Sequence, residues 1–265
     1  MVKMIAVDMD GTFLSSTKEY NRERFAQLYT KMQEQDVKFV VASGNQYYQL
    51  KSFFPEIASD ISFVAENGAL VISEDEELLC GKMQESLIQD ILVFLETIPD
   101  VRTILCGRQS AYVETKFLPE LIEEAQQYYH RLDVVPTFKE LPEDVFFKFA
   151  LNVPDTETTT IMAIINEKFG EKIAAVTSGH GDIDIIIKGL HKANGLRVLQ
   201  EKWQIRADDI VAFGDGGNDL EMLRHVGHSY AMENGSDIVR ETAKYHAPHN
   251  DTEGVLEVIE KLLNR

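Results

Sequence analysis

The segment "KMIAVDMDGTFL" (residues 3–14) decides the fold. An apolar run leads directly into two aspartates, Asp8 and Asp10, which are one residue apart and are followed by Gly-Thr. The apolar run predicts a short buried strand. Two acids after such a strand either begin a solvated loop or lie at the carboxyl end of a central strand, where open α/β sheets keep their active sites. The rest of the sequence favours the second interpretation.

Strand and helix patterns alternate at both ends of the chain. Near the start, the helical spacing of residues 21–36 is followed by the β-branched run "VKFVVAS" (37–43). The same alternation resumes after residue 190, with a helical pattern over 192–203 and a strand pattern in "DIVAFGD" (209–215). This order predicts an α/β fold with a doubly wound parallel sheet and right-handed crossovers.

The middle of the chain has a different pattern. Short strand-like runs such as "RTILCG" (102–107) lie close together, and helical spacing extends through "PELIEEAQQYYHRL" (119–132). A sheet pattern that stops and later resumes indicates an insertion. We therefore expect a core of residues 1–82 and 188–265 with an α+β unit, residues 83–187, inserted into it. A chain of 265 residues is long enough for two such domains.

Composition narrows the possible partners. The net charge of −18 argues against nucleic acid or an anionic membrane surface. No apolar run reaches the roughly 18 residues that a membrane span needs, and no signal-peptide pattern is present. The two cysteines, Cys80 and Cys106, are not spaced like metal ligands, so we expect a reducing cytoplasm. The oligomeric state stays open.

Four segments fall at the ends of predicted core strands: "DMDGT" (8–12), "VASGN" (41–45), "HKANG" (191–195) and "GDGGND" (214–219). Together they supply carboxylates, a hydroxyl, Lys192 and loop N–H groups. Carboxylates and water are the ligands that Mg²⁺ prefers. A lysine and loop N–H groups can hold phosphate oxygens. The set predicts metal-assisted chemistry at phosphorus, and the metal with Lys192 would form a local positive centre that admits an anionic substrate.

Other interpretations apply to some of these residues. Asp215 and Asp219 can instead cap the helix that follows them, but the first motif favours a site. His225 and His228 are expected to be structural, because Mg²⁺ disfavours imidazole. Lys148 lies between aromatic residues in "FFKFAL" (146–151) and is either a surface lysine with a packed aliphatic stem or a pocket residue.

With the four motifs in this order, the chain resembles the haloacid-dehalogenase-superfamily phosphatases of the Cof-type branch, which carry a large inserted cap. It is most similar to the bacterial sugar phosphatases of that branch. The stretches "VAENGALV" (64–71), "AMENGSDIV" (231–239) and "AVTSGHGDIDIII" (175–187) agree with this resemblance. The resemblance extends over essentially the whole chain.

The resemblance implies a role for each matching residue. Asp8 would be the nucleophile that becomes phosphorylated, and Asp10 the general acid and base. Mg²⁺ would be held by Asp8, by the backbone carbonyl of Asp10 and by Asp215, while Asp219 would orient metal-bound water or Lys192. Phosphate or substrate would be held by groups of Met9, Ser43, Gly44, Asn45, Lys192 and Asn218. Candidate cap contacts are His130, Arg131, Lys148 and His180, with Asp182 a weaker one.

Two positions depart from the family pattern. Many relatives have Thr where Ser43 stands, which keeps the hydroxyl. Many have Arg where Asn45 stands, so a cation near the phosphate is lost and more weight falls on Lys192 and the metal.

The resulting expectation is a Mg²⁺-dependent phosphatase that acts on small phosphorylated sugars through an aspartyl-phosphate. Flavin or pyridoxal phosphates remain alternative substrates, and phosphate transfer to a sugar hydroxyl remains an alternative reaction. A non-catalytic sugar-phosphate sensor is a third possibility, although binding alone needs no nucleophile.

Overall fold

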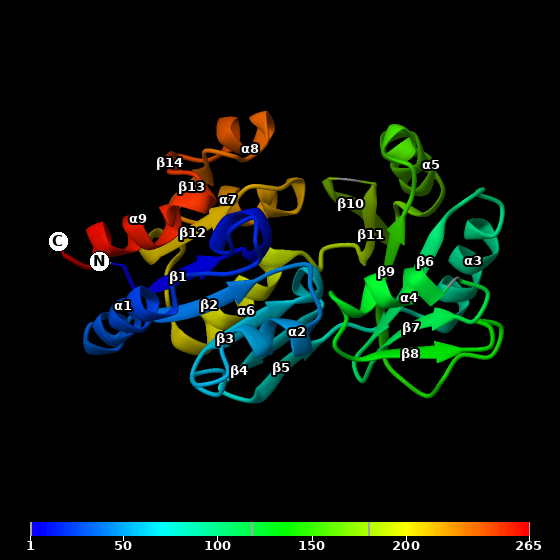
Figure 1. Cartoon of the computed structure of the whole chain (residues 1–265), viewed down its shortest axis with the longest axis horizontal. Coiled ribbons are helices and arrows are strands. Elements are labelled where there is room, and N and C mark those ends of the chain that lie inside the picture. Colours follow the sequence, from blue (N-terminus) through cyan, green and yellow to red (C-terminus); the bar gives the residue numbers. More distant parts are fainter. Residues whose placement is uncertain (1, 118, 180, 265) are drawn as a thin grey trace.

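The structure is a computed structural model that describes residues 2–117, 119–179 and 181–264. Two sheets lie side by side along the long axis of the molecule, and helices pack on both (Figure 1). Strands from the two ends of the chain form the larger sheet, and strands from the middle form the smaller one. The predicted α/β class is confirmed.

The larger sheet has the order β14-β13-β12-β1-β2-β3-β4-β5. Neighbouring strands from β14 to β3 are parallel, and β1 pairs with β12 on one side and with β2 on the other. All four residues of β1 are buried, as expected for a central strand of a parallel sheet. The strands are β1 (Met4–Val7), β2 (Lys38–Ala42), β3 (Ser62–Ala65), β4 (Leu70–Ser73), β5 (Glu76–Cys80), β12 (Ile210–Gly214), β13 (His228–Met232) and β14 (Tyr245–Ala247).

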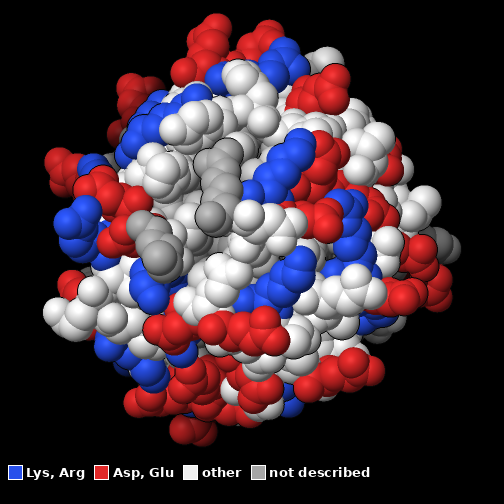
Figure 2. Space-filling view, turned by 90° about the vertical axis from the view of Figure 1, so that its left-hand side faces the viewer, with Lys and Arg blue, Asp and Glu red and all other residues white. Residues whose placement is uncertain are grey.

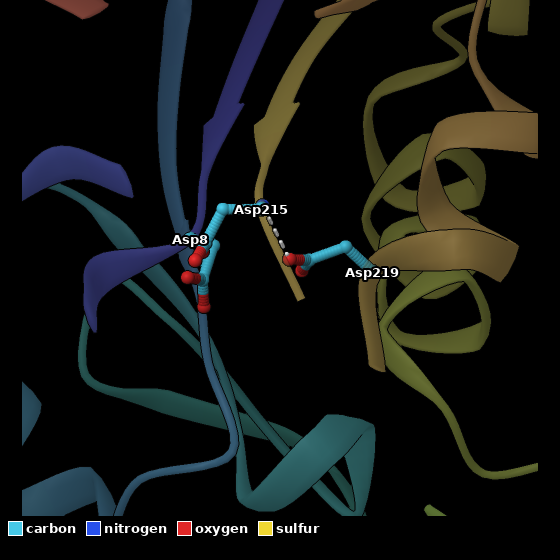
Figure 3. Close-up of side chains that lie close together, drawn as sticks. All are labelled: Asp8, Asp215 and Asp219. Carbon is cyan, nitrogen blue, oxygen red and sulfur yellow. Dashed lines mark hydrogen bonds between the residues drawn. The ribbon is translucent and has the colours of Figure 1, made fainter. Parts of the chain in front are cut away.

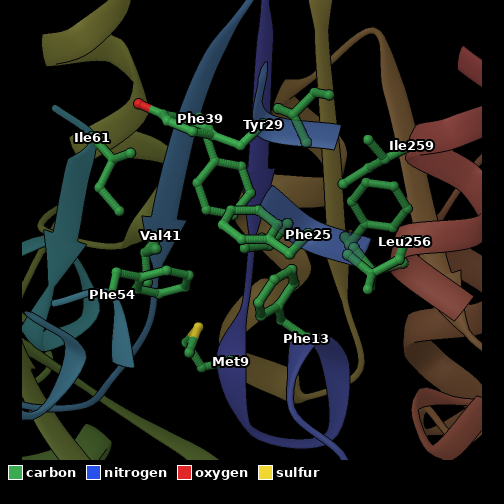
Figure 4. Packing of buried hydrophobic residues seen from close by; sticks show 14 of the residues in the cluster. Met9, Phe13, Phe25, Tyr29, Phe39, Val41, Phe54, Ile61, Leu256 and Ile259 are labelled. Atoms are coloured by element: carbon green, nitrogen blue, oxygen red, sulfur yellow. The ribbon is translucent and has the colours of Figure 1, made fainter. Parts of the chain in front are cut away.

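Helices cover both faces of this sheet. Alternate residues of β1 point to opposite faces, Ile5 into one core cluster and Ala6 into another. Aromatic residues such as Phe13, Phe25 and Phe39 fill the first cluster (Figure 4). Helices α1 (Arg22–Glu34), α2 (Tyr47–Phe53) and α9 (Gly254–Leu263) pack on that face, and α6 (Lys192–Trp203), α7 (Leu220–His225) and α8 (Asp237–Thr242) on the other.

One edge of the larger sheet differs from the prediction of a parallel sheet. Strand β4 runs antiparallel to β3, and β5 antiparallel to β4. The connection from β3 to β4 is too short for a parallel crossover, because only residues 66–69 join them. The sequence pattern did not predict β5, whose first two residues, Glu76 and Glu77, are exposed.

We call the elements from α3 to β11 the cap. Its sheet has the order β10-β11-β9-β6-β7-β8 and is antiparallel except between β7 and β8. Its strands are β6 (Arg102–Gly107), β7 (Ala111–Glu114), β8 (Leu132–Val135), β9 (Phe146–Asn152), β10 (Ile173–Gly179) and β11 (Asp182–Ile187). Its helices are α3 (Glu85–Leu95), α4 (Pro119–Gln126) and α5 (Thr158–Phe169).

The predicted helix over residues 119–132 is wrong at its end. Helix α4 ends at Gln126, and Leu132 already begins β8, which pairs with β7. The β-branched residues Val134 and Val135 and the open edge of β7 favour a strand there. The proposed boundaries near residues 82 and 188 fall between β5 and α3 and between β11 and α6.

The surface at one end of the molecule carries side chains of both charges. Figure 2 shows one end of the molecule, where basic and acidic side chains are interspersed rather than gathered by sign. Among the residues described, no helix has both the length and the apolar character needed to cross a bilayer.

Candidate active site

The first and fourth motifs meet at the carboxyl edge of the larger sheet. Val7 of β1 lies opposite Phe213 of β12, and the Asp8 N–H donates to the carbonyl of Phe213 at 3.1 Å. Strand β2, which follows β1 in the chain, lies on one side of it, and β12, β13 and β14 lie on the other, so the strand order switches direction at β1. A crevice at such a switch point is where open α/β sheets bind ligands.

Three carboxylates gather in this crevice. Asp8, Asp215 and Asp219 each offer an oxygen, and these oxygens lie within 4.8 Å of one another. Figure 3 shows Asp8 and Asp215 at the ends of their strands and Asp219 reaching back from the following helical turn. One Asp219 oxygen accepts from the backbone N–H groups of Asp215 and Gly216, both at 3.0 Å. Hydrogen bonds thus fix the loop that carries Asp215.

Lys192 is the cation of this cluster. It begins α6, is fully buried, and donates to Asp8 Oδ1 and to Asp219 Oδ1, each at 2.7 Å. Burial disfavours its charge, but Asp219 and Asp8 outweigh this, so the pKa of Lys192 is raised. A buried lysine between two carboxylates joins the third motif to the first and fourth.

One ammonium does not compensate three carboxylates. Burial raises the pKa of Asp8 well above its ordinary value despite the contact with Lys192. Burial, followed by repulsion from Asp219, raises the pKa of Asp215 to about 6. A set of carboxylate oxygens with uncompensated negative charge suits a hard divalent cation such as Mg²⁺. The described residues therefore fit a metal site.

The turn after Asp8 is specified by Gly11. Its φ is +73°, and a Cβ there would collide with the Asp215 carboxylate. The next residue, Thr12, donates through Oγ1 to Asp215 Oδ1 at 2.8 Å. Glycine is required at this position because a side chain has neither the backbone conformation nor the space it needs.

Asp10 is held away from the carboxylate cluster. Asn45 Nδ2 donates to Asp10 Oδ2 at 2.6 Å, and Lys18 forms an ion pair with Asp10 Oδ1. Asn45 therefore contacts the expected general acid directly. Lys18, which the sequence analysis did not single out, supplies a cation beside Asp10.

A cavity of about 580 Å³ extends from this crevice to the cap. On the core side it is lined by Asp8, Asp10, Ser43, Asn45 and Asp215, together with Gly44 and Asn218. Aromatic residues of the cap, Phe117, Tyr128 and Tyr129, line it together with polar residues that include Arg102, Asn152 and Asp182. The cavity thus has the residues expected to hold phosphate on its core side and a mixture of aromatic and polar side chains on its cap side.

The predicted cap residues have different positions. Lys148 lines the cavity and is 1% exposed, so it is not a surface lysine. The guanidinium of Arg131 lies 3.6 Å from the Tyr48 ring centroid, and neither Arg131 nor His130 lines the cavity. His180 lies outside the described residues. On the core side, the Met9 side chain is fully buried in the core cluster.

Besides Lys18, three residues near the site were missed as functional candidates. Glu66 and Asn67 lie in the turn after β3, and Asp184 lies in β11. Their signal was present, because "VAENGALV" and "GDIDIII" both belong to the resemblance. Sequence spacing gave no reason to bring the two stretches together.

Comparisons with known proteins agree with this geometry. A model of the haloacid dehalogenase-like hydrolases matches residues 5–259. The chain is 51% identical to 5-amino-6-(5-phospho-D-ribitylamino)uracil phosphatase YbjI of Escherichia coli, with 99% of this chain and 96% of that protein covered. The Bacillus subtilis phosphatase YitU, named for the same substrate, is 25% identical over 95% of this chain and 94% of its own length. The crystal structure of SMU.1108c from Streptococcus mutans is 40% identical, covers both chains fully and has a TM-score of 0.96.

Together with these comparisons, the site identifies the chain as a phosphoric monoester hydrolase whose three clustered carboxylates could hold a metal ion. The chain belongs to the haloacid dehalogenase-like hydrolases. Within that family it is a Cof-type phosphatase, as the resemblance predicted.

Proposed function

We propose that this protein is a Mg²⁺-dependent phosphatase whose substrate is 5-amino-6-(5-phospho-D-ribitylamino)uracil, a phosphorylated sugar alcohol joined to a pyrimidine ring. The observation that carries the proposal is the cavity, which has carboxylates at one end and Phe117, Tyr128 and Tyr129 in the cap. Flat aromatic side chains suit a pyrimidine ring, and polar residues suit ribityl hydroxyls. Two relatives named for this substrate support it. The proposed substrate thus differs from the sugar phosphate expected from the sequence: it is a sugar-alcohol phosphate that carries a pyrimidine ring.

In the proposed mechanism, one oxygen of Asp8 attacks phosphorus while the bond to the ribityl oxygen breaks. Asp10, in its acid form, gives its proton to the departing oxygen, and Asn45 and Lys18 hold its carboxyl group in place. Water then attacks the phosphorus of the aspartyl-phosphate, and Asp10 accepts the proton of that water. Inorganic phosphate leaves and the Asp8 carboxylate is restored.

The remaining residues hold charge. Lys192 fixes one Asp8 oxygen, which leaves the other for attack. Ser43, the Gly44 N–H and Asn218 hold the phosphate oxygens. Asp8, Asp215 and the Asp10 carbonyl would hold Mg²⁺, which when bound shields the phosphate charge from the attacking carboxylate and stabilises the transition state.

Metal binding is expected to depend on pH. Without metal, the pKa of Asp215 is raised to about 6 from 3.8, so its contribution to stability is present below about pH 4 and is lost as the pH rises through 6. A bound Mg²⁺ would favour the carboxylate form of Asp215 and so offset that loss. We expect Mg²⁺ to raise the melting temperature more at pH 7.5 than at pH 5, and Asp215→Asn to remove the difference. Equal stabilisation at both pH values would contradict the metal assignment.

The substrate proposal is tested by phosphate release with Mg²⁺ and with a chelator. We expect kcat/KM for 5-amino-6-(5-phospho-D-ribitylamino)uracil to exceed that for hexose phosphates, FMN and pyridoxal phosphate by at least about tenfold, since several binding contacts are lost with each alternative. An equal kcat/KM for a hexose phosphate would instead favour the sugar phosphatase expected from the sequence. An added polyol that becomes phosphorylated would reveal phosphate transfer.

A further inference from the structure

Buried charged groups join the cap to the core beside the phosphate-binding loop. Lys148 of β9 donates to the carbonyl of Gly44 at 2.7 Å, and its Nζ lies 2.8 Å from Glu66 Oε2. Both side chains are at most 2% exposed. Burying an ion pair carries a large desolvation penalty for each ion, so such a pair contributes little net stability. Its contact with the loop that carries Ser43 suggests a role in the site.

A second connection runs through Asn67. The Asn67 amide nitrogen donates to Asp184 Oδ2 of the cap at 2.5 Å. Its amide oxygen accepts from Asn218 Nδ2 at 3.1 Å. Because a carboxylate such as Asp184 only accepts hydrogen bonds, it fixes which end of the Asn67 amide faces Asn218. The cap residue thus determines the hydrogen-bonding partner of a core residue in the fourth motif.

The packing leaves little freedom for this arrangement. A Cβ on Gly44 would lie 3.0 Å from Asn67 Oδ1 and 3.2 Å from Asp184 Oδ2, so the phosphate-binding loop rests directly against both residues. On the other side, a Cβ on Gly217 would lie 3.1 Å from the carbonyl oxygen of Thr177 in β10. Two neighbouring cap strands therefore touch the loops on either side of the crevice.

We propose that Asp184 and Asn67 are positioning residues for phosphate transfer. Asp184 orients the amide of Asn67, which binds one N–H of Asn218 and directs the second toward a phosphate oxygen. The phosphate site is then complete only when the cap is seated on the core. This inference rests on the proposed role of Asn218 in holding phosphate.

The test exchanges donor and acceptor. Asn67→Asp places two carboxylates against each other and removes the donor, so we expect kcat with p-nitrophenyl phosphate and with the proposed substrate to fall about 10- to 100-fold. Asp184→Asn keeps an acceptor and is expected to stay within about threefold of wild type. The double variant Asn67→Asp/Asp184→Asn restores a donor facing an acceptor, and we expect its kcat to recover to within about threefold.

A matched control separates orientation from charge. Asp133→Asn makes the same change at an exposed aspartate of cap strand β8 that does not line the cavity, and combined with Asn67→Asp it is expected to leave kcat as low as Asn67→Asp alone does. Recovery of kcat in both double variants, or in neither, overturns the proposed positioning of Asn218 by Asp184 and Asn67. Melting temperatures with and without Mg²⁺ identify variants that do not fold. If Asn67→Asp does not fold, Asp184→Ala provides the test, with an expected tenfold loss of kcat that Asp184→Asn does not show.

Asn218→Ala distinguishes failure of this inference from failure of the site assignment. An unchanged kcat for Asn218→Ala contradicts the proposed role of Asn218 in holding phosphate, and the proposed positioning by Asp184 and Asn67 fails with it. A reduced kcat for Asn218→Ala together with an unchanged kcat for Asn67→Asp contradicts only the proposed positioning of Asn218 by Asp184 and Asn67.

Discussion

Asp8→Asn is expected to lower kcat by at least about 10³-fold on every substrate, because the amide cannot form the acyl phosphate through which turnover passes. The shape of the residue is kept, and the hydrogen bond from Lys192 to Oδ1 has an amide oxygen to accept it. Burial already raises the pKa of Asp8, so loss of its charge is not expected to destabilise the fold. Phosphate release and the melting temperature measure the two effects separately.

The exposed Asp90 of α3 provides a matched control, since Asp90→Asn makes the same chemical change at a residue that does not line the cavity and should leave kcat unchanged. Labelled substrate locates the intermediate. We expect the labelled phosphate on Asp8 of the wild-type protein and no adduct in Asp8→Asn. Label on another residue, or turnover by Asp8→Asn near the wild-type rate, would refute the covalent mechanism.

Lys148→Met is expected to lower the free energy of unfolding by about 3–5 kcal/mol, the cost of leaving a buried charge without its partner. Glu66 would lose the ammonium 2.8 Å away. The pKa of Glu66 is already raised, because burial outweighs the effect of Lys148. In the variant its carboxyl group takes up a proton as the pH falls, so the loss of stability should be smaller at pH 5 than at pH 8. Urea unfolding at the two pH values measures this.

Two further variants control this prediction. Lys172→Met removes an exposed lysine and should change the unfolding free energy by no more than about 0.5 kcal/mol. The double variant Lys148→Met/Glu66→Gln removes both charges of the buried pair, although Asp184 still loses the ammonium 3.6 Å away, and we expect it to be more stable than Lys148→Met alone. Strict additivity of the two single changes would show that the pair is not coupled.

Much of the core and its site could be predicted from local pattern. Buried runs such as residues 4–7 report strands directly, and parallel strands bring their carboxyl ends to one edge, so Asp8 and Asp215 were expected to meet. The contact between Lys192 and Asp8 spans 184 residues, yet the same rule anticipates it, because α6 begins at that edge. The metal and the residue roles remain proposals.

Contacts between the cap and the core could not be predicted in this way. Lys148 faces Glu66, and Asp184 faces Asn67 across 117 residues of sequence, because the cap docks at one particular angle. Periodicity describes one element at a time and carries no information about that angle. Arg131 illustrates the same limit, since its cation lies over the Tyr48 ring rather than in the cavity.

The pairing of β1 with β12 has a consequence for how the chain folds. Their partners Met4 and Ile210 are separated by more than two hundred residues, whereas all six strands of the cap come from one continuous segment. Contacts distant in sequence form slowly. During synthesis all six cap strands can pair once residue 187 has left the ribosome. Strand β1 can pair with β12 only after residue 214 has been made, so that edge of β1 is unpaired until then. Strand β12, which follows the cap in the chain, therefore completes the part of the sheet that carries Asp8 and Asp215.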